Sequence, residues 1–399
     1  MLIGIVGKPS SGKTTLFNAL CLTDAKTGSY PFTTIEPNRG MAFVRVECPC
    51  KDKEFQCQPR AGYCDNGTRY IQVEMLDVAG LVPGASSGKG MGNQFLDDLR
   101  QAHALIHVID ATGTTDAEGN QVDSYDPSLD VEWLNTELSA WIYNIVFKDW
   151  DRVSRKLDAD RSKTNEVLTE RLTGLGATLQ MIKKSVSKCD MVNSNPKQWS
   201  DEQKTKLSSA LREEIFPMVI AANKSDSPKS APHIDKLTSD HPDYIIINTS
   251  GLAEYTLRKA DKDGIIEYHP GNLSFTIQDE GKNPKILKIV NTINEKMLSQ
   301  GISTGVIELL ERAVYEVLGM IAVFPVEDPS HLTDHDGRIL PDVFLVPPKT
   351  TAKEFAGYIH TDLANSFINA ILVSENNKRI SAAHELKNMD VIKIVSAAK

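Results

Sequence analysis

The sequence predicts an α/β fold with a mostly parallel sheet, a helical insert and a smaller α+β module towards the C-terminal end. Three observations predict it. Apolar runs of strand length alternate with helical patterns over residues 1–127, and this alternation returns over residues 217–319. Residues 128–216 contain a single proline and follow helical spacing. Strand patterns around one helix then fill residues 320–399.

The α/β domain is expected to combine residues 1–127 with residues 217–319, because the helical insert interrupts its strand pattern. Residues 104–110 have the apolar character of a fully buried strand, whereas residues 71–75 alternate like a half-buried one. The expected strands are residues 3–6, 71–75, 104–110, 218–223 and 244–247. Helices are expected at residues 16–20, 285–299 and 304–319.

The insert of residues 128–216 is expected to be all helical. Its apolar residues from Leu168 to Val186 alternate in steps of four and three, the pattern of paired helices, and predict a coiled hairpin. Gly174 and Gly176 interrupt that pattern. In the last module we expect strands at residues 321–324, 343–346 and 391–395 and a helix at 351–360.

The composition is that of an ordinary globular protein, with 41% apolar and 24% charged residues among 399. No apolar stretch reaches eighteen residues and no charged leader precedes the first strand, so we expect a cytoplasmic protein with no membrane partner. We also expect a monomer. The net charge of −9 argues against a surface that coats nucleic acid. Any RNA contact is expected to be a local patch.

Residues 7–14, GKPSSGKT, fit the pattern G-x-x-x-x-G-K-[ST] between a strand and a helix. Such a loop wraps its backbone N–H groups around phosphate, with the helix N-terminus adding positive potential. Lys13 is expected to bridge the β- and γ-phosphate oxygens, and the Thr14 hydroxyl to bind magnesium. The residues expected to bind nucleotide here are Lys8, Pro9, Ser10, Ser11, Gly12, Lys13, Thr14 and Thr15.

A second phosphate motif, Asp77-Val78-Ala79-Gly80, ends a buried strand. Asp77 is expected to hold magnesium through water, and the Gly80 amide to sense the γ-phosphate. Between the two motifs, a threonine in residues 30–37 can complete the magnesium shell while the γ-phosphate is present. We choose Thr34, with Thr33 as the competitor.

The base-binding motif is Asn223-Lys224-Ser225-Asp226, which follows an apolar strand. The Asp226 carboxylate can accept hydrogen bonds from guanine N1 and N2, a donor pair that adenine lacks. The lysine stem can cover one face of the base. After the next strand, the backbone amides of Ser250, Gly251 and Leu252 are expected to hold guanine O6.

These motifs resemble those of the Obg-like GTPases, and residues 77–100 are similar to the YchF subfamily. Residues 340–346 and 359–363 resemble a TGS domain. The resemblance implies a P-loop G domain, an inserted coiled coil and a C-terminal β-grasp-like TGS module. It also implies GTP and GDP as ligands, Mg²⁺ as cofactor, and association with the ribosome or RNA near translation or stress response.

Several positions qualify this resemblance. Leu81 stands where Ras-like proteins carry a water-orienting glutamine, so hydrolysis is expected to be slow. The related family offers a catalytic histidine at the position of His107, whose alternative is a buried strand residue bonded to backbone. Lys224 and Asp226 favour GTP over the ATP that some YchF members prefer. Ser10 replaces the asparagine of potassium-dependent members, which puts potassium activation in doubt.

Two further features leave alternatives open. Cys48, Cys50, Cys57 and Cys64 can form a four-thiolate zinc site or stay unconnected thiols, because their spacing is not the usual C-x-x-C pair. Residues 148–188 hold ten Lys or Arg against six Asp or Glu, which suits RNA phosphates or a solvated helix surface. The alternatives to a slow GTPase are a nucleotide-gated ribosome or RNA adaptor with negligible turnover and an ATPase of the same family.

Overall fold

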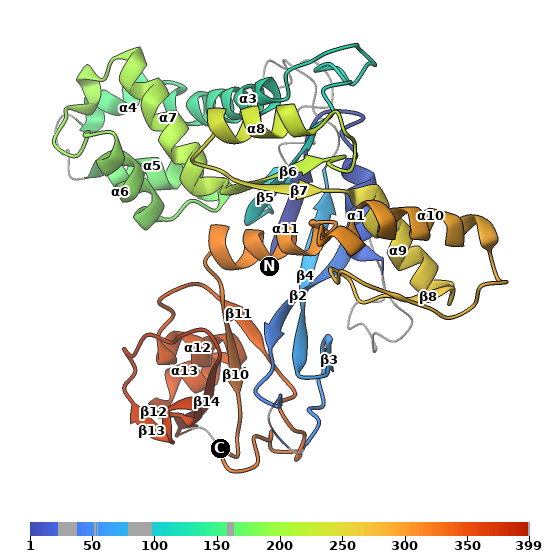
Figure 1. The fold of residues 1–399 in the computed structure, drawn as a ribbon. Coiled ribbons are helices and arrows are strands. Elements are labelled where there is room, and N and C mark those ends of the chain that lie inside the picture. The colour runs from blue at the N-terminus through green and yellow to red at the C-terminus, as the bar shows by residue number, and fades with distance from the viewer. Residues whose placement is uncertain (23–37, 52, 54, 79–97, 158–162, 398–399) are drawn as a thin grey trace. The chain divides into compact units, whose positions relative to one another are not determined.

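The computed structural model describes residues 1–399 except 23–37, 52, 54, 79–97, 158–162 and 398–399 (Figure 1). The chain divides into two compact units. The first comprises Met1–Cys21, Asn38–Gly40 and Glu74–Leu309, and the second comprises Leu22–Pro37, Met41–Val73 and Leu310–Lys399. In the described residues, no helix is long and apolar enough to cross a membrane.

The principal sheet has the strand order β2-β4-β1-β5-β6-β7, with β3 paired to β4. The pairs β4-β1, β1-β5, β5-β6 and β6-β7 are parallel, whereas β3 pairs antiparallel with β4. The strands are β1 (Leu2–Val6), β2 (Arg39–Glu47), β3 (Tyr63–Asp65), β4 (Thr68–Asp77), β5 (Ala104–Asp110), β6 (Met218–Asn223) and β7 (Ile245–Thr249). All five strands predicted for the α/β domain are present, and β5 is buried along its whole length.

The register of the parallel strands brings their carboxyl ends together at one edge of the sheet. Asp110 of β5 lies opposite Asn223 of β6, and Asn223 lies opposite Thr249 of β7. Val6, at the end of β1, lies opposite His107 of β5. In open α/β sheets this edge is where ligands bind. The segments that follow these strands are therefore close in space although they lie far apart in the sequence.

Helices cover both faces of this sheet. On one face, Val131 of α3 (Ser128–Phe147) and Leu237 of α8 (Ala231–Asp240) pack on Ile109 and Ile220. On the other face, α1 (Lys13–Cys21) lies beside α9 (Gly251–Lys262), which also contacts α10 (Pro284–Lys296) (Figure 1). The two short strands β8 (Ile266–Glu267) and β9 (Thr276–Ile277) pair between α9 and α10, and α11 (Val306–Arg312) follows.

The predicted insert is helical, but it is not a coiled hairpin. Its helices are α3, α4 (Trp150–Leu157), α5 (Thr164–Leu172), α6 (Leu179–Lys188) and α7 (Asp201–Ile215). The expected seam is divided between α5 and α6, because Gly176 adopts the left-handed conformation with φ +74° and Thr178 caps the next helix by accepting from the Met181 N–H. The insert packs as a compact cluster in which the rings of Trp150 and Trp199 stack 5.3 Å apart.

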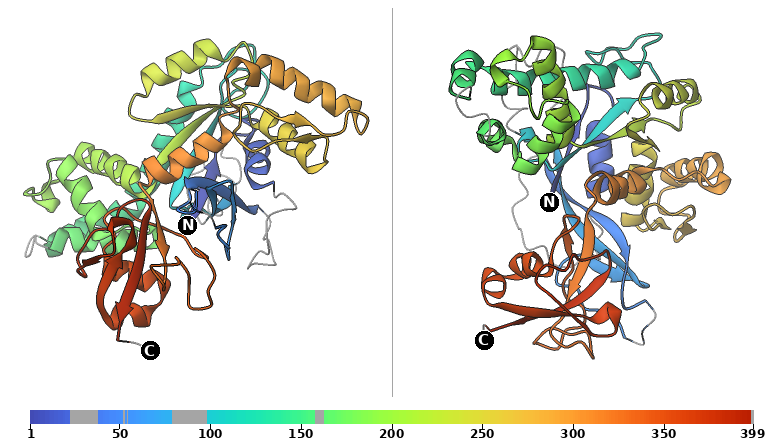
Figure 2. Two further views of the ribbon diagram at one scale, coloured as in Figure 1. Left: turned by 60° about the horizontal axis from the view of Figure 1, so that its bottom comes forward. Right: turned by 90° about the vertical axis from the view of Figure 1, so that its left-hand side faces the viewer.

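The second unit contains a five-stranded sheet in the order β11-β10-β14-β12-β13, with α12 (Ala352–Ile359) and α13 (Thr361–Asn365) against it (Figure 2). Its strands are β10 (Ile321–Pro325), β11 (Phe344–Val346), β12 (Phe367–Leu372), β13 (Lys378–Ile380) and β14 (Asp390–Ser396). Phe355 of α12 is fully buried in the core of this module. The predicted strands at residues 321–324, 343–346 and 391–395 correspond to β10, β11 and β14, and the predicted helix at 351–360 corresponds to α12.

The second unit also includes residues 41–73, which the predicted boundaries assign to the first domain. The physical reason is a set of hydrogen bonds to the C-terminal part. The N–H of Gln58 donates to the Ile339 carbonyl at 2.8 Å, and the N–H of Arg60 donates to the Pro341 carbonyl at 2.9 Å. The Arg45 guanidinium also pairs with Glu311 at 2.7 Å.

Candidate nucleotide-binding site

The loop between β1 and α1 has the backbone shape that its glycines permit. Gly7 has φ +149° and Gly12 has φ +96°, a region that other residues rarely adopt. A Cβ added to Gly12 would lie 2.3 Å from Nδ2 of Asn223, and one added to Gly7 would lie 2.4 Å from the Val108 carbonyl oxygen. The two glycines therefore allow the loop to approach β5 and β6 more closely than any side chain would.

The Lys13 ammonium and the Thr14 hydroxyl lie at the mouth of this loop. Lys13 Nζ donates to the Lys8 carbonyl at 2.9 Å, and burial lowers the pKa of Lys13 while Asp77 opposes that shift. Thr14 Oγ1 donates to Asp77 Oδ2 at 2.9 Å. Burial raises the pKa of Asp77, opposed by Thr14 and Lys13. A hydroxyl and a carboxylate side by side form the oxygen donor set that magnesium prefers.

The Lys8 side chain turns away from the loop mouth and is 1% exposed. Its ammonium pairs with Asp130 at 2.9 Å, donates to the Thr115 carbonyl at 2.7 Å and lies 4.0 Å from the centre of the Tyr125 ring. Of the predicted nucleotide contacts at Lys8, only the backbone amide remains available. The side chain instead anchors the loop to the segment after β5.

The remaining loop residues are placed as follows. Pro9 has no N–H to donate, and Ser10 is exposed with φ +62°. The buried Ser11 hydroxyl donates to the Lys8 carbonyl at 3.0 Å. Thr15 is partly buried in the first turn of α1. The loop is thus shaped by its own hydrogen bonds as well as by its glycines.

Asn223 joins the phosphate loop to the base-binding loops. Its Nδ2 donates to the Ser11 carbonyl at 3.0 Å, and its Oδ1 accepts from the Gly251 N–H at 3.1 Å and from the Thr249 hydroxyl at 3.4 Å. Its side chain is nearly fully buried. Asn223 was predicted to bind nucleotide, and both ends of its amide are used within the protein. Leu252, predicted to contribute an amide, has a 66% exposed side chain.

Lys224 and Asp226 are oriented by neighbouring residues. Lys224, at φ +64°, donates from Nζ to the Ser10 carbonyl at 2.9 Å and to Asp110 Oδ2 at 2.8 Å. The Asp226 carboxylate is exposed and accepts from the Ser250 hydroxyl at 2.7 Å. The Lys224 ammonium is thus held by the protein, which leaves the aliphatic part of the side chain able to lie against a base. The Asp226 carboxylate is exposed to solvent.

Asp110 is a site residue that sequence reasoning missed. It is fully buried at the end of β5 and accepts from Lys224 and from the hydroxyls of Thr112 at 2.6 Å and Thr115 at 2.9 Å. Burial raises the pKa of Asp110, but the hydrogen bonds with Lys224, Thr112 and Thr115 outweigh it and lower the pKa below its ordinary value. A carboxylate at the end of an apolar strand, beside the strand that carries the base motif, was the available signal.

His107 is buried within the sheet. It lies in the middle of β5, 1% exposed, and neither ring nitrogen has a hydrogen-bond partner. Burial, together with the positive charges of Lys13 and Lys8, lowers the pKa of His107 to about 3, so the ring is neutral. Its catalytic role stays a prediction, and this placement favours the alternative of a buried strand residue, although without the expected bond to backbone.

Gly80, Thr33, Thr34 and Leu81 lie outside the described residues. Their predicted roles at the γ-phosphate therefore stay predictions. The described parts of the site, from Gly7 to Thr14 and at Asp77, Asp226 and Ser250, all belong to the first compact unit.

Comparisons with known proteins show which families the chain is similar to. A family model described as 50S ribosome-binding GTPase matches residues 2–136. One described as Obg-like GTPase YGR210-like, G4 motif-containing domain, matches residues 221–328, and the TGS domain model matches residues 332–396. The uncharacterized GTP-binding protein MJ1332 of Methanocaldococcus jannaschii is 44% identical over 399 residues, which is 100% of both chains.

The chain belongs to the Obg-like GTPases of the YchF type. The uncharacterized GTP-binding protein C428.15 of Schizosaccharomyces pombe is 38% identical over 362 residues, 88% of each chain. A solved structure described as a GTP binding protein from Pyrococcus horikoshii OT3 covers 100% of both chains with a TM-score of 0.81 and 35% identity. The Schizosaccharomyces pombe YchF GTPase shares the fold, with a TM-score of 0.58 and 19% identity over 99% of this chain and 97% of that one.

Membership of this family confirms the predicted P-loop G domain and C-terminal TGS domain. It also confirms the predicted activity class, a GTP-binding GTP hydrolase. The archaeal and fission-yeast relatives are more similar than YchF of Bacillus subtilis, which is 28% identical over 372 residues, 93% of this chain and 88% of that protein. The chain therefore lies in the archaeal and eukaryotic branch, as predicted.

Proposed function

We propose that this chain binds GTP in preference to ATP, hydrolyses it slowly with magnesium, and uses the two nucleotide states as a switch on the ribosome or another RNA. The observation that carries the proposal is the link between the two halves of the site. The Lys224 ammonium donates a hydrogen bond to the Ser10 carbonyl in the phosphate loop, and the Asp226 carboxylate accepts one from the Ser250 hydroxyl. A base recognised by Asp226 is thus read in a fixed relation to the phosphates.

Guanine selectivity follows from the chemistry of the Asp226 carboxylate. Its oxygens accept hydrogen bonds, and guanine offers donors at N1 and N2 where adenine has an acceptor at N1 and no amino group at C2. The Ser250 hydroxyl occupies Oδ1 from the protein side and orients the carboxylate. Adenine would leave that carboxylate without its partners, so we propose that ATP binds more weakly.

At the phosphate end, Thr14 and Asp77 are the residues that would hold magnesium. When bound, magnesium neutralises charge that develops on the β- and γ-phosphate oxygens. Lys13 leaves the Lys8 carbonyl to contact the phosphates, and the backbone amides of the loop and the N-terminus of α1 surround them. Leu81 cannot orient an attacking water, so turnover is slow, and Ser10 gives no reason to expect potassium activation.

Ribosome association rests on relatives rather than on a charged surface. A family model that matches residues 2–136 is described as a 50S ribosome-binding GTPase, and the Bacillus subtilis relative is named a ribosome-binding ATPase. The insert uses several of its cations internally: Lys184 pairs with Glu214 at 2.8 Å, Lys188 pairs with Glu213, and Arg171 donates to backbone carbonyls. These pairs favour a mixed solvated surface on the insert over a continuous phosphate-binding one.

We propose that the helical insert, through its mixed-charge surface rather than a continuous basic one, and the TGS domain each contribute to contact with the ribosome or RNA. We also propose that the protein acts in the cytoplasm as a monomer. The ATPase alternative is supported by the names of the bacterial relatives, and it fails if Asp226 excludes adenine. The adaptor alternative differs only in turnover. Both alternatives can be separated from the proposal by measurements on the purified chain.

The first experiment is a competition between GTP and ATP for the purified protein with magnesium. We expect GTP to bind at least about 100-fold more tightly, the effect of two hydrogen bonds to a charged group. Equal affinities, or tighter binding of ATP, would contradict the guanine assignment.

The second experiment measures phosphate release and ribosome co-sedimentation with GTP and GDP. Lys13→Ala is expected to abolish phosphate release, whereas Lys183→Ala, on the exposed face of α6, leaves it unchanged. No phosphate release from the unmodified chain, together with ribosome binding that ignores the nucleotide, would favour the adaptor.

A further inference from the structure

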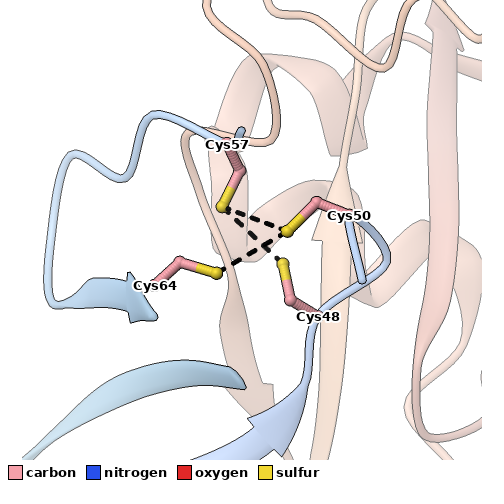
Figure 3. A group of neighbouring side chains, drawn as sticks. All are labelled: Cys48, Cys50, Cys57 and Cys64. Atoms are coloured by element: carbon pink, nitrogen blue, oxygen red, sulfur yellow. Dashed lines mark hydrogen bonds between the residues drawn. The ribbon is translucent and has the colours of Figure 1, made fainter. Parts of the chain in front are cut away.

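Four cysteines of the second unit converge on one point. Cys48 directly follows β2, Cys50 lies in the next turn, Cys57 lies in the loop beyond it, and Cys64 lies in β3. Their sulfur atoms all lie within 4.8 Å of one another, and none is in a disulfide (Figure 3). Cys48, Cys50 and Cys57 are buried, and Cys64 is partly buried.

The distances between the sulfur atoms match a single metal ion. Cys48 and Cys57 are 3.7 Å apart, Cys50 and Cys57 are 3.6 Å apart, and Cys50 and Cys64 are 3.6 Å apart. Four sulfurs at about 2.3 Å from one tetrahedral zinc ion would lie about 3.8 Å from one another. A disulfide needs about 2.05 Å between its sulfurs. The four sulfur atoms are thus spaced as the ligands of one zinc ion are, and they are too far apart to form disulfides.

We propose that Cys48, Cys50, Cys57 and Cys64 bind one structural zinc ion as four thiolates. Thiolates are soft ligands that select zinc among the common divalent cations, and a closed set of four is typical of structural rather than catalytic zinc. The site belongs to the second unit, separate from the nucleotide-binding residues of the first.

The surroundings of the cluster suit a negatively charged metal centre. A zinc ion with four thiolates carries a net charge of about −2, which a buried cation can partly balance. Arg69 is fully buried, and one end of its guanidinium lies 3.6 Å from Cys57 Sγ. The same guanidinium donates to the carbonyls of Leu340 at 3.1 Å and Pro341 at 2.9 Å. Hydrogen-bond donors around ligand atoms orient them and tune their basicity.

The proposed ion would fix the loop that joins the two sequence segments of the second unit. Immediately after Cys57, Gln58 and Arg60 make backbone hydrogen bonds to Ile339 and Pro341. The Arg60 side chain also pairs with Asp342 at 2.6 Å. These residues lie just before β11 of the C-terminal module. Zinc at the base of this loop therefore stabilises the contact between residues 48–64 and the segment 339–342.

The test is the metal content of the purified full-length chain, produced with zinc and kept under reducing conditions. We expect about one zinc ion per chain by mass spectrometry of the metal. Cys57→Ser is expected to lower it at least about tenfold, because a closed four-ligand site loses one of its thiolates. Cys189→Ser is the matched control: Cys189 is also buried, but it belongs to the core of the helical insert.

A second measurement keeps the proposal testable if Cys57→Ser does not fold. In the unsubstituted chain, a mercurial reagent is expected to release zinc in step with the titration of four thiols. Replacement of the zinc by Co²⁺ should give the visible absorption of a tetrahedral thiolate complex. A chain that binds no zinc under reducing conditions, that carries disulfides among these four cysteines, or that holds iron in place of zinc would overturn the proposal.

Discussion

Replacing Asn223 by alanine tests whether the two halves of the nucleotide site are coupled through one buried side chain. The amide donates to the Ser11 carbonyl at 3.0 Å and accepts from the Gly251 N–H at 3.1 Å. It is 3% exposed, so water cannot readily take its place. Alanine leaves one acceptor in the phosphate loop and one donor at the start of α9 without their partners.

The expected magnitude follows from these two hydrogen bonds. Leaving a buried polar group unsatisfied costs about 1–3 kcal/mol, so two groups cost about 2–6 kcal/mol. In the nucleotide-free variant the two loops are expected to relax until these groups find other partners, so nucleotide binding has to restore the loop positions at this cost. At the lower end the cost corresponds to about 30-fold weaker nucleotide binding. Because Asn223 acts on the loops and not on the base, GTP, GDP and inosine triphosphate, which lacks the 2-amino group, should lose affinity by similar factors.

Calorimetric titration with the three nucleotides measures these factors, and circular dichroism checks that the variant is folded. Asn144→Ala removes the same side chain from an exposed position on α3 and should bind all three as the unsubstituted protein does. Two results would refute the reasoning. One is affinity for GTP within about twofold of the unsubstituted protein, well below the loss expected for an unsatisfied buried group. The other is a loss seen with GTP and absent with inosine triphosphate, which would indicate direct contact with the 2-amino group of guanine.

Three other predictions concern single positions of the first unit. Gly12→Ala would place a methyl group 2.3 Å from Asn223 at a φ of +96° and should abolish nucleotide binding in calorimetry, whereas Gly174→Ala, with no atom within 4 Å, should bind normally. Asp226→Asn presents an amide to guanine N1 and N2 and should weaken GTP at least about 100-fold while improving xanthosine triphosphate; unchanged GTP affinity would contradict the base assignment. His107 has a folded pKa of about 3, below its ordinary 6.5, so its contribution to stability is complete above pH 6.5 and is lost as the pH falls towards 3. Lowering the pH from 7.5 to 5 should therefore reduce the free energy of unfolding, measured by urea titration, by about 2 kcal/mol through this residue. In His107→Leu this part of the pH dependence should be absent. The same variant should hydrolyse GTP normally, and a large fall in turnover at unchanged affinity would instead make His107 catalytic.

The phosphate loop could be predicted from the sequence because all its determinants are local. Gly7, Gly12 and Lys13 lie within seven residues of one another between a strand and a helix, and the backbone adopts the expected shape. The strand at residues 104–110 was predicted for a similar reason, since β5 is buried along its whole length and its composition reflects that burial.

Partnerships across the sequence could not be predicted in this way. Lys8 stands in the phosphate loop and was interpreted as a nucleotide contact, yet its partners Thr115 and Asp130 lie more than a hundred residues away. The same limit applies to Cys48 and Cys64, whose spacing matches no common pair and whose proximity depends on the pairing of β3 with β4. Only the folded chain brings such residues together.

The predicted coiled hairpin was wrong for a different reason. Steps of four and three residues place apolar side chains on one face of any helix that packs against a core, and they do not distinguish a long seam from two short helices. The distinction depends on Gly176, which has φ +74° and ends the first helical stretch. The glycines were visible in the sequence and carried more information than the periodicity.

Asp110 shows how preorganisation can give base selectivity without a contact to the base. A lysine beside a triphosphate would ordinarily move its charge towards the phosphates. Here the buried Asp110 carboxylate and the Ser10 carbonyl bind the Lys224 ammonium before any nucleotide arrives, and the backbone of Lys224 is already in the left-handed conformation. The ordering cost of the lysine is therefore met during folding and not on binding. What remains for the nucleotide to satisfy is the exposed Asp226 carboxylate, and that group distinguishes guanine from adenine.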